Sequence, residues 1–153
     1  MEDIFSLLDN VQKPGDLGVN NRVLIVDGLN LYLRAFAVNG ALNDNGVPVG
    51  GLTGFLRSLA YAIREVNPTR VIIVYDGAGG SQRRAHTLLD EDVTIMSADQ
   101  DFLQLVNERI TVWSPIKKKF YTPRMVMDDY GVPAHNFLMY KVLMGDKSDN
   151  IEG

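Results

Sequence analysis

The stretch Val93–Leu105, VTIMSADQDFLQL, sets an apolar run directly against two aspartates. Its first four residues are apolar or β-branched, which is typical of a buried strand. Asp99 and Asp101 follow where that strand would end. Because two nearby carboxylates repel each other, each disfavours the charged form of the other unless a cation neutralises them. The stretch therefore predicts a strand that ends in a charged site.

Two other apolar runs end in the same way. Val23–Val26 precedes Asp27, and Val71–Tyr75 precedes Asp76. Unbroken apolar runs are typical of strands that are buried on both faces of a parallel sheet. Ile110–Ser114 forms a weaker fourth run. We therefore expect an α/β fold with a mostly parallel central sheet flanked by helices.

Helical patterns alternate with these runs. Gly50–Pro68 carries apolar residues at helical spacing, which predicts a βαβ unit between the first two strands. A second helix is expected to open just after Asp99 and Asp101. A third should run between Thr122 as N-cap and Gly131, and a last apolar helix should end at Gly145. No repeat or linker interrupts the pattern, so residues 1–153 are expected to form one domain, with 1–20 as an N-terminal lead-in.

Composition narrows the function classes. The 153 residues are 46% hydrophobic, enough for one globular core, and include no cysteine. This excludes a disulfide framework, a thiolate zinc site and a cysteine nucleophile. The N-terminus carries Glu2 and Asp3 where a secretory signal would be basic, and no apolar run reaches the ~18 residues of a membrane span, so a cytoplasmic location is expected. The net charge of −4, from 15 basic and 19 acidic residues, argues by itself against a nucleic-acid partner.

The acidic residues are expected to gather at one edge of the sheet, because ligands of open α/β sheets bind outside the carboxyl ends of the strands. The motif GDKSDN follows a helix and adds two aspartates that could reach the same crevice. The six candidate metal ligands are Asp27, Asp76, Asp99, Asp101, Asp146 and Asp149. Mg²⁺ takes oxygen ligands, and two such ions about 4 Å apart can hold both the attacking and the leaving oxygen of a phosphodiester. Each motif alone has another interpretation: a strand-terminal Asp-Gly is often a turn, and D-x-D also fits a sugar-nucleotide transferase or a solvated helix start.

Taken in order, the motifs resemble a known family. LIVDGLN, VYDGAGGSQRR, IMSADQDFLQL, VWSPIKKKFY and VLMGDKSDNIEG resemble the 5′-nuclease superfamily, which includes flap endonucleases and the 5′-to-3′ exonuclease domains of bacterial polymerases. The likeness runs from about Asn21 to Gly153. Within the family it is strongest to the enzymes of T-even bacteriophages that are called ribonuclease H.

The resemblance implies hydrolysis of DNA or RNA strands near a 5′ end or flap, with two Mg²⁺ or Mn²⁺ ions and no covalent intermediate. Asp27 and Asp76 would serve the first metal. The second metal would be served, directly or through water, by Asp99, Asp101, Asp146 and Asp149. Arg83 and Arg84 match the start of the family's helical arch and would hold the scissile phosphate.

The resemblance also implies partners. These are branched or 5′-flap DNA and RNA/DNA hybrids, and a single-strand-binding protein or sliding clamp in phage DNA replication, with the nuclease acting as a monomer in the cytoplasm of an infected host. Lys147 would contact nucleic acid. Lys117, Lys118 and Lys119 form either a solvated turn or a phosphate contact.

The chain departs from the family between Arg84 and Asp90. Family members continue there into an arch and then a helix bearing Glu-Ala-Asp-Asp, whose acids bridge the two metals. Here only about sixteen residues separate Asp76 from Val93, close to the minimum for a parallel crossover. Either the arch is deleted or those residues are missing from this sequence. The chain also stops where the family enters a helical hairpin that binds K⁺. Both differences remove basic residues, so the acidic balance does not exclude a DNA partner.

Two other functions stay open. A nuclease-fold module could bind branched DNA without cutting it, because the Glu-Ala-Asp-Asp motif is missing. A PIN-type ribonuclease would share the sheet and the metals, but it should lack GDKSDN and would cut single-stranded RNA. Metal-dependent cleavage of a 5′-flap substrate separates the enzyme from the binding module.

Overall fold

The computed structural model describes residues 21–75, 91–146 and 151–152. Its centre is a five-stranded sheet with the strand order β2-β1-β3-β4-β5. The strands are β1 (Arg22–Asp27), β2 (Arg70–Val74), β3 (Asp92–Met96), β4 (Ile110–Ser114) and β5 (Lys119–Tyr121). The first four are parallel, and β5 pairs antiparallel with β4. The predicted α/β fold with a mostly parallel sheet is confirmed.

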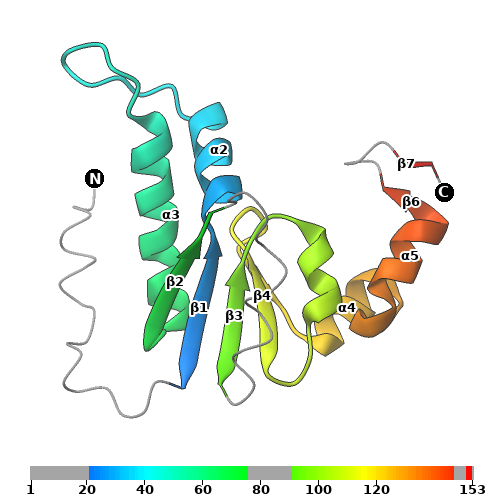
Figure 1. Cartoon of the computed structure of the whole chain (residues 1–153). Coiled ribbons are helices and arrows are strands. Elements are labelled where there is room, and N and C mark those ends of the chain that lie inside the picture. Colours follow the sequence, from blue (N-terminus) through cyan, green and yellow to red (C-terminus); the bar gives the residue numbers. More distant parts are fainter. Residues whose placement is uncertain (1–20, 76–90, 147–150, 153) are drawn as a thin grey trace.

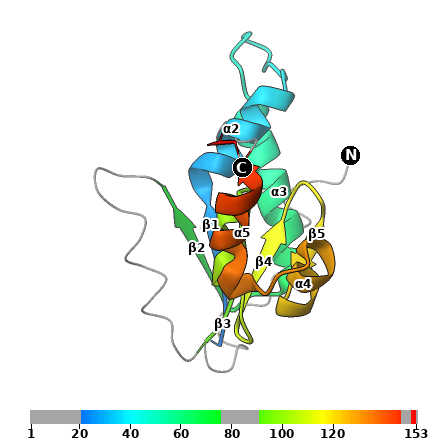
Figure 2. The same ribbon diagram turned by 90° about the vertical axis from the view of Figure 1, so that its right-hand side faces the viewer.

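Helices cover both faces of this sheet (Figures 1 and 2). The α-helices are α2 (Gly28–Val38), α3 (Gly50–Val66), α4 (Pro123–Tyr130) and α5 (Phe137–Met144), and the 3₁₀ helices are η4 (Gln100–Leu105) and η5 (Ala134–Asn136). Helices α2 and α3 lie side by side, and the loop that joins them projects beyond the sheet. A short antiparallel pair, β6 (Gly145–Asp146) and β7 (Ile151–Glu152), follows α5.

Two cores lie on opposite faces of the sheet because alternate residues of a strand point to opposite sides. One core joins α2 and α3 to the strands through Leu24, Val26, Leu31, Phe55, Ala62, Met96 and Trp113. The other joins η4, α4, η5 and α5 to the strands through Val93, Ile95, Leu103, Val106, Val112, Tyr121, Val126, Ala134 and Phe137. The sheet is therefore the middle of three layers. Because β1 to β4 are parallel, their carboxyl ends lie along the same edge of the sheet.

The residues predicted to begin and end the helices near the C-terminus are confirmed. Thr122 caps α4 by accepting a hydrogen bond from the Met125 amide at 3.4 Å, Pro123 occupies the first turn, and Gly131 ends the helix at φ 72°. Gly145 follows α5, as predicted. In the described ranges, no helix has both the length and the apolar character required to span a bilayer.

Three elements differ from the sequence prediction. Helix α2 was not predicted; it begins directly after β1, because Asp27 serves as its N-cap. The helix after the paired aspartates is a short 3₁₀ helix, since Val106 turns to an extended conformation and the Asn107 side chain caps the turn into β4. Strand β5 was not predicted, because it begins inside the lysine run.

Candidate active site

The carboxyl ends of β1 and β3 form the centre of the candidate site. These strands are parallel neighbours, with Val26 opposite Met96, so Asp27 and Ser97 end up side by side. The Ser97 hydroxyl donates a hydrogen bond to Asp27 Oδ2 at 3.0 Å. The other oxygen, Asp27 Oδ1, accepts from the Asn30 amide at 3.1 Å and caps α2. Both oxygens of Asp27 are thus oriented by groups of the protein.

Glycine follows Asp27 for a steric reason. A Cβ at Gly28 would lie 2.8 Å from Tyr75 Cζ and 2.9 Å from Ile73 Cγ2. The first turn of α2 can therefore pack against the end of β2 only if residue 28 lacks a side chain. The Asp-Gly pair of the sequence motif thus fixes both the cap and the close approach of the helix.

Ser97 also joins Asp27 to the paired aspartates. Its hydroxyl, on a residue only 3% exposed, accepts from the Asp99 amide at 3.1 Å. Asp99 Oδ1 in turn accepts from the Asp101 amide at 2.9 Å and caps η4. We call Asp27, Ser97, Asp99 and Asp101 the carboxylate edge.

Lys141 from α5 completes this hydrogen-bonded run. Its ammonium contacts Asp101 Oδ1, and the Lys141 side chain is 13% exposed against 50% for Asp101. The contact brings α5 to the carboxylate edge. Ser97 and Lys141 were both missed by sequence reasoning. Ser97 could have been found, because it places a hydroxyl between a strand and a D-x-D pair. Lys141 could not, because it lies forty residues from its partner Asp101.

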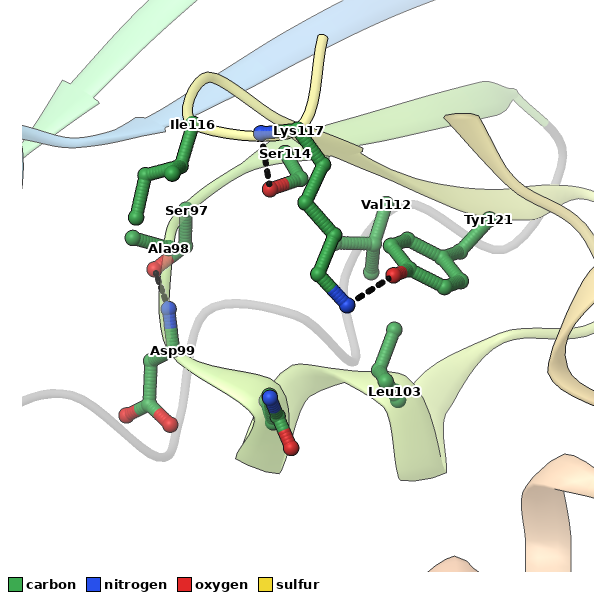
Figure 3. A pocket seen from close by; sticks show the side chains of 10 residues that line it. Ser97, Ala98, Asp99, Leu103, Val112, Ser114, Ile116, Lys117 and Tyr121 are labelled. Carbon is green, nitrogen blue, oxygen red and sulfur yellow. Dashed lines mark hydrogen bonds between the residues drawn. The ribbon is translucent and has the colours of Figure 1, made fainter. Parts of the chain in front are cut away.

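A small cavity of about 90 Å³ adjoins the carboxylate edge (Figure 3). Ser97 and Asp99 line one side, and Ser114, Lys117 and Tyr121 line the other. The Lys117 ammonium donates to the Tyr121 hydroxyl at 2.9 Å. The cavity is therefore lined by a cation and a phenol from the β4–β5 hairpin and by one carboxylate, Asp99.

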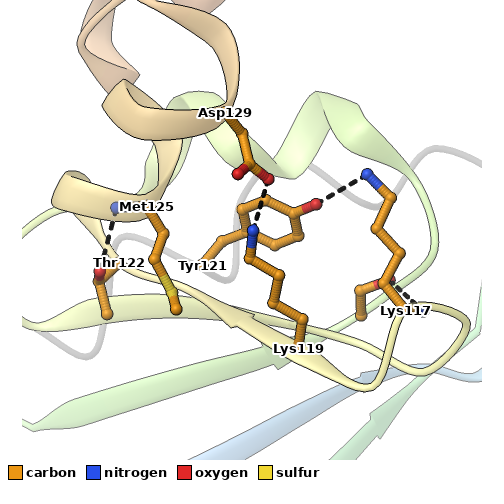
Figure 4. Close-up of polar contacts among 7 residues, drawn as sticks. Lys117, Lys119, Tyr121, Thr122, Met125 and Asp129 are labelled. Carbon is orange, nitrogen blue, oxygen red and sulfur yellow. Dashed lines mark hydrogen bonds and ion pairs between the residues drawn. The ribbon is translucent and has the colours of Figure 1, made fainter.

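The hairpin between β4 and β5 carries the three consecutive lysines. Lys117 contacts Tyr121, and Lys119 Nζ pairs with Asp129 Oδ2 at 2.6 Å (Figure 4). Lys118 adopts φ 48° at the turn, with its ammonium 5.4 Å from the ring centroid of Tyr61. All three cations already interact with neighbouring side chains. We call Lys117, Lys119, Tyr121 and Asp129 the basic hairpin network.

Protonation in this network follows from these contacts. The hydrogen bond to Tyr121 raises the pKa of Lys117 above its ordinary value. The hydrogen bond from Lys119 lowers the pKa of Asp129. Burial raises the pKa of the neighbouring Tyr130. Each shift favours the protonation state that keeps the network intact at neutral pH.

The predicted site residues fall into two groups. Asp27, Asp99 and Asp101 are brought to one edge, and the backbone of Asp146 lies in β6 directly after α5. The others lie outside the described residues: Asp76, Arg83, Arg84, Lys147 and Asp149. Within the described ranges, no three acidic, histidine or cysteine side chains are close enough to hold a metal ion. The all-carboxylate donors that are present suit a hard divalent cation, and their role as ligands stays a prediction.

Comparisons with known proteins agree with the fold and the motifs. No protein-family model matches the chain. It is 27% identical over 195 residues to a 5′-3′ exonuclease of Bacillus subtilis, covering 88% of this chain and 66% of the relative. It is 29% identical over 184 residues to the thermostable DNA polymerase I of Thermus filiformis, covering 86% of this chain and 22% of that one. These two similarities support the resemblance of the chain to the 5′-nuclease superfamily.

Solved structures share this fold. The T5 D15 protein co-crystallised with metal ions superposes with a TM-score of 0.61 at 16% identity, over 87% of this chain and 70% of that one. The T5 D15 flap endonuclease in a pseudo-enzyme-product complex with DNA and metal ions gives a TM-score of 0.60 at 16% identity, with the same coverage. At this identity the likeness concerns the fold.

The matched stretch is longer in the relatives than in this chain. The chain spans about two thirds of the Bacillus relative and about one fifth of the Thermus relative. Since 88% of 153 residues is about 135, about 60 of the 195 aligned positions in the Bacillus comparison have no counterpart here. The relatives therefore carry additional residues inside the matched stretch.

Proposed function

We propose that the chain is a metal-dependent 5′-to-3′ exonuclease and flap endonuclease that hydrolyses phosphodiester bonds of DNA and of RNA primers in RNA/DNA hybrids. The observation that carries this proposal is the carboxylate edge. The Asp27 carboxylate and the Asp99 backbone amide bind the same buried hydroxyl, that of Ser97, at the end of two parallel strands. The sequence likeness to a protein named 5′-3′ exonuclease supports the same reaction class.

The cofactor proposed is a pair of Mg²⁺ or Mn²⁺ ions. Asp27 and Asp76 would hold the first ion, and Asp99, Asp101, Asp146 and Asp149 the second, directly or through water. When bound, such ions polarise the phosphodiester and stabilise both the attacking and the leaving oxygen. Ser97 would then orient Asp27, and Asn30 would hold the other oxygen of that carboxylate in place. Solved neighbours described with metal ions, including zinc, support a divalent cofactor.

Basic residues would bind the substrate phosphates. Arg83 and Arg84 are proposed to hold the scissile phosphate, since a guanidinium can donate two parallel hydrogen bonds to phosphate oxygens. Lys117, Lys118, Lys119 and Lys147 are proposed to contact the nucleic-acid backbone. For Lys119 a phosphate would compete with Asp129, its present partner at 2.6 Å.

The proposed partners are branched or 5′-flap DNA and RNA/DNA hybrids, and a single-strand-binding protein or sliding clamp. A flap endonuclease complex with DNA among the solved neighbours supports the DNA substrate. We further propose that the protein acts as a monomer in phage DNA replication, in the cytoplasm of the host. The likeness of its motifs to the ribonuclease H of T-even bacteriophages supports that setting. A K⁺ site would belong to the helical hairpin that follows in the family.

A second candidate is a module that binds branched DNA without cleaving it. The specific observation in its favour is the shorter matched stretch, because about 60 positions of the Bacillus relative have no counterpart here. The missing acids of the Glu-Ala-Asp-Asp helix would weaken the charge stabilisation of both metals. A PIN-type ribonuclease is the third candidate, and the GDKSDN motif speaks against it.

One experiment separates the three. A labelled 5′-flap DNA, a nicked RNA/DNA hybrid and a single-stranded RNA are incubated with the chain in Mn²⁺ or in EDTA, beside Asp27→Asn. The nuclease proposal expects Mn²⁺-dependent cleavage of the flap and the hybrid that Asp27→Asn abolishes. Flap binding in a gel-shift assay without cleavage would establish the binding module instead. Cleavage of the single-stranded RNA alone would establish the PIN-type activity.

A further inference from the structure

Lys141 holds an unusual position for a lysine. It projects from α5, and its side chain is only 13% exposed. The other side of that helix is open, since Leu138, Val142 and Leu143 are 57%, 62% and 68% exposed. Helix α5 therefore faces the carboxylate edge with Lys141 and not with these apolar residues. Its ammonium contacts Asp101 Oδ1.

Lys141 contacts an oxygen of Asp101, and the backbone of Asp101 is itself hydrogen-bonded to the carboxylate edge. The Asp101 amide donates to Asp99 Oδ1 at 2.9 Å, and the Asp99 amide donates to the Ser97 hydroxyl that holds Asp27. Lys141 thus places one positive charge at the end of a connected run of three carboxylates. Such a charge offsets the negative charge of the Asp101 carboxylate that it contacts.

We propose that Lys141 is a built-in counter-cation of the carboxylate edge, which neutralises Asp101 in the metal-free protein and competes with a divalent ion for it. This inference rests on the proposed metal-dependent function. An ammonium and a divalent cation repel each other and seek the same carboxylate oxygen, so the lysine lowers the metal affinity while it stabilises the metal-free fold. Lys141 is a positioning residue in this account, because it acts through Asp101.

Replacement of Lys141 by a metal ion at Asp101 would also affect helix α5, which carries Lys141. Helix α5 leads directly into Gly145–Asp146 of β6, and Asp146 is one of the predicted ligands. A metal ion that binds Asp101 in place of Lys141 would break the contact between Asp101 and α5. The same helix leads to Asp146. Metal binding and the setting of α5 are therefore coupled.

The test is a calorimetric titration of the full chain with Mn²⁺, comparing wild type, Lys141→Met and Lys141→Arg. Arg124→Met is the matched control, because it removes the same unit of charge from an exposed pair with Asp128 on α4. We expect Lys141→Met to bind Mn²⁺ about two- to tenfold more tightly, the range of a partly exposed charge pair. Lys141→Arg and Arg124→Met should bind like wild type. In EDTA, Lys141→Met should melt at a lower temperature than wild type.

Unchanged or weaker Mn²⁺ binding by folded Lys141→Met, with wild type binding normally, would overturn this inference alone. Absence of Mn²⁺ binding by wild type would overturn the proposed metal-dependent function together with it. If Lys141→Met does not fold, as judged by circular dichroism, Lys141→Gln takes its place, since its amide can still donate to Asp101. Tighter binding by Lys141→Gln supports the proposal, and unchanged or weaker binding rejects it.

Discussion

The carboxylate edge and the basic hairpin network lie on neighbouring strands, yet their charges are arranged in opposite ways. In the hairpin each of the named cations has its own acceptor: Lys119 meets Asp129 and Lys117 meets Tyr121. At the edge, three carboxylates follow one another through backbone and serine hydrogen bonds, and Lys141 contacts the last of them. A network in which each cation has an acceptor is complete as folded, whereas an edge with an excess of negative charge is suited to receive cations.

The largest difference between the two regions should appear in catalysis. Asp27→Asn and Asp99→Asn keep a side-chain oxygen that can cap α2 and η4, but they remove the charge. If the edge holds metal, each should lower metal-dependent flap cleavage by about 100-fold or more. Asp129→Asn, in the hairpin network, should change the rate by less than about threefold by the same reasoning. Cleavage rates of the three variants are measured under single-turnover conditions. Equal losses of rate in the carboxylate edge and in the hairpin network would contradict the functional difference between them.

The second difference concerns two buried serines. Ser97 bridges Asp27 and Asp99, while Ser114 accepts one longer bond from the Lys117 amide at 3.3 Å. Ser97→Ala removes a donor to a charged carboxylate and should lower the free energy of unfolding by about 1–3 kcal/mol. Ser114→Ala should lower it by about 1 kcal/mol or less. Urea unfolding of both variants measures the difference, and a larger loss for Ser114→Ala would contradict the ranking.

The hairpin network should be sensitive to alkali. The pKa values of Lys117 and Tyr130 are both raised in the folded protein, by the hydrogen bond to Tyr121 and by burial, respectively. Groups with a raised pKa contribute stability that is fully present below the unfolded pKa, about 10, and is lost as the pH rises through the folded value. Thermal midpoints measured from neutral pH upward should fall more steeply for wild type than for Tyr130→Phe. Parallel curves would show that Tyr130 does not contribute.

The smallest expected effect lies on the acid side. Lys119 lowers the pKa of Asp129, whose side chain is partly exposed. A lowered pKa contributes stability that is present above the unfolded value and is lost as the pH falls through the folded one. Asp129→Asn should therefore lower the stability slightly near neutrality, and its difference from wild type should disappear as the pH falls below about 4. Nuclear magnetic resonance titration of the Asp129 carboxyl carbon gives the same answer directly, since an ordinary midpoint would mean that the pair with Lys119 does not form in solution.

The sequence predicted the sheet well because its strands are continuous apolar runs, and the placement of Asp27 and Asp99 followed from parallel topology. It missed α2, because an Asp-Gly pair after a strand has the same composition in a turn as at a helix N-cap. It also missed Ser97 and Lys141 as members of the site. Their roles depend on partners seventy and forty residues away, which no local pattern encodes.

The most direct test of the central claim is the thermal stability of the full chain with and without divalent metal. Wild type and the double variant Asp27→Asn, Asp99→Asn are heated in millimolar Mg²⁺ or Mn²⁺ and in EDTA at matched ionic strength. A cation that binds only the native state raises the midpoint by mass action. The account predicts a clear rise for wild type and none for the double variant, which in EDTA should melt no lower than wild type because repulsion is relieved. Identical wild-type midpoints with metal and with EDTA would contradict the claim that the carboxylate edge is a metal site.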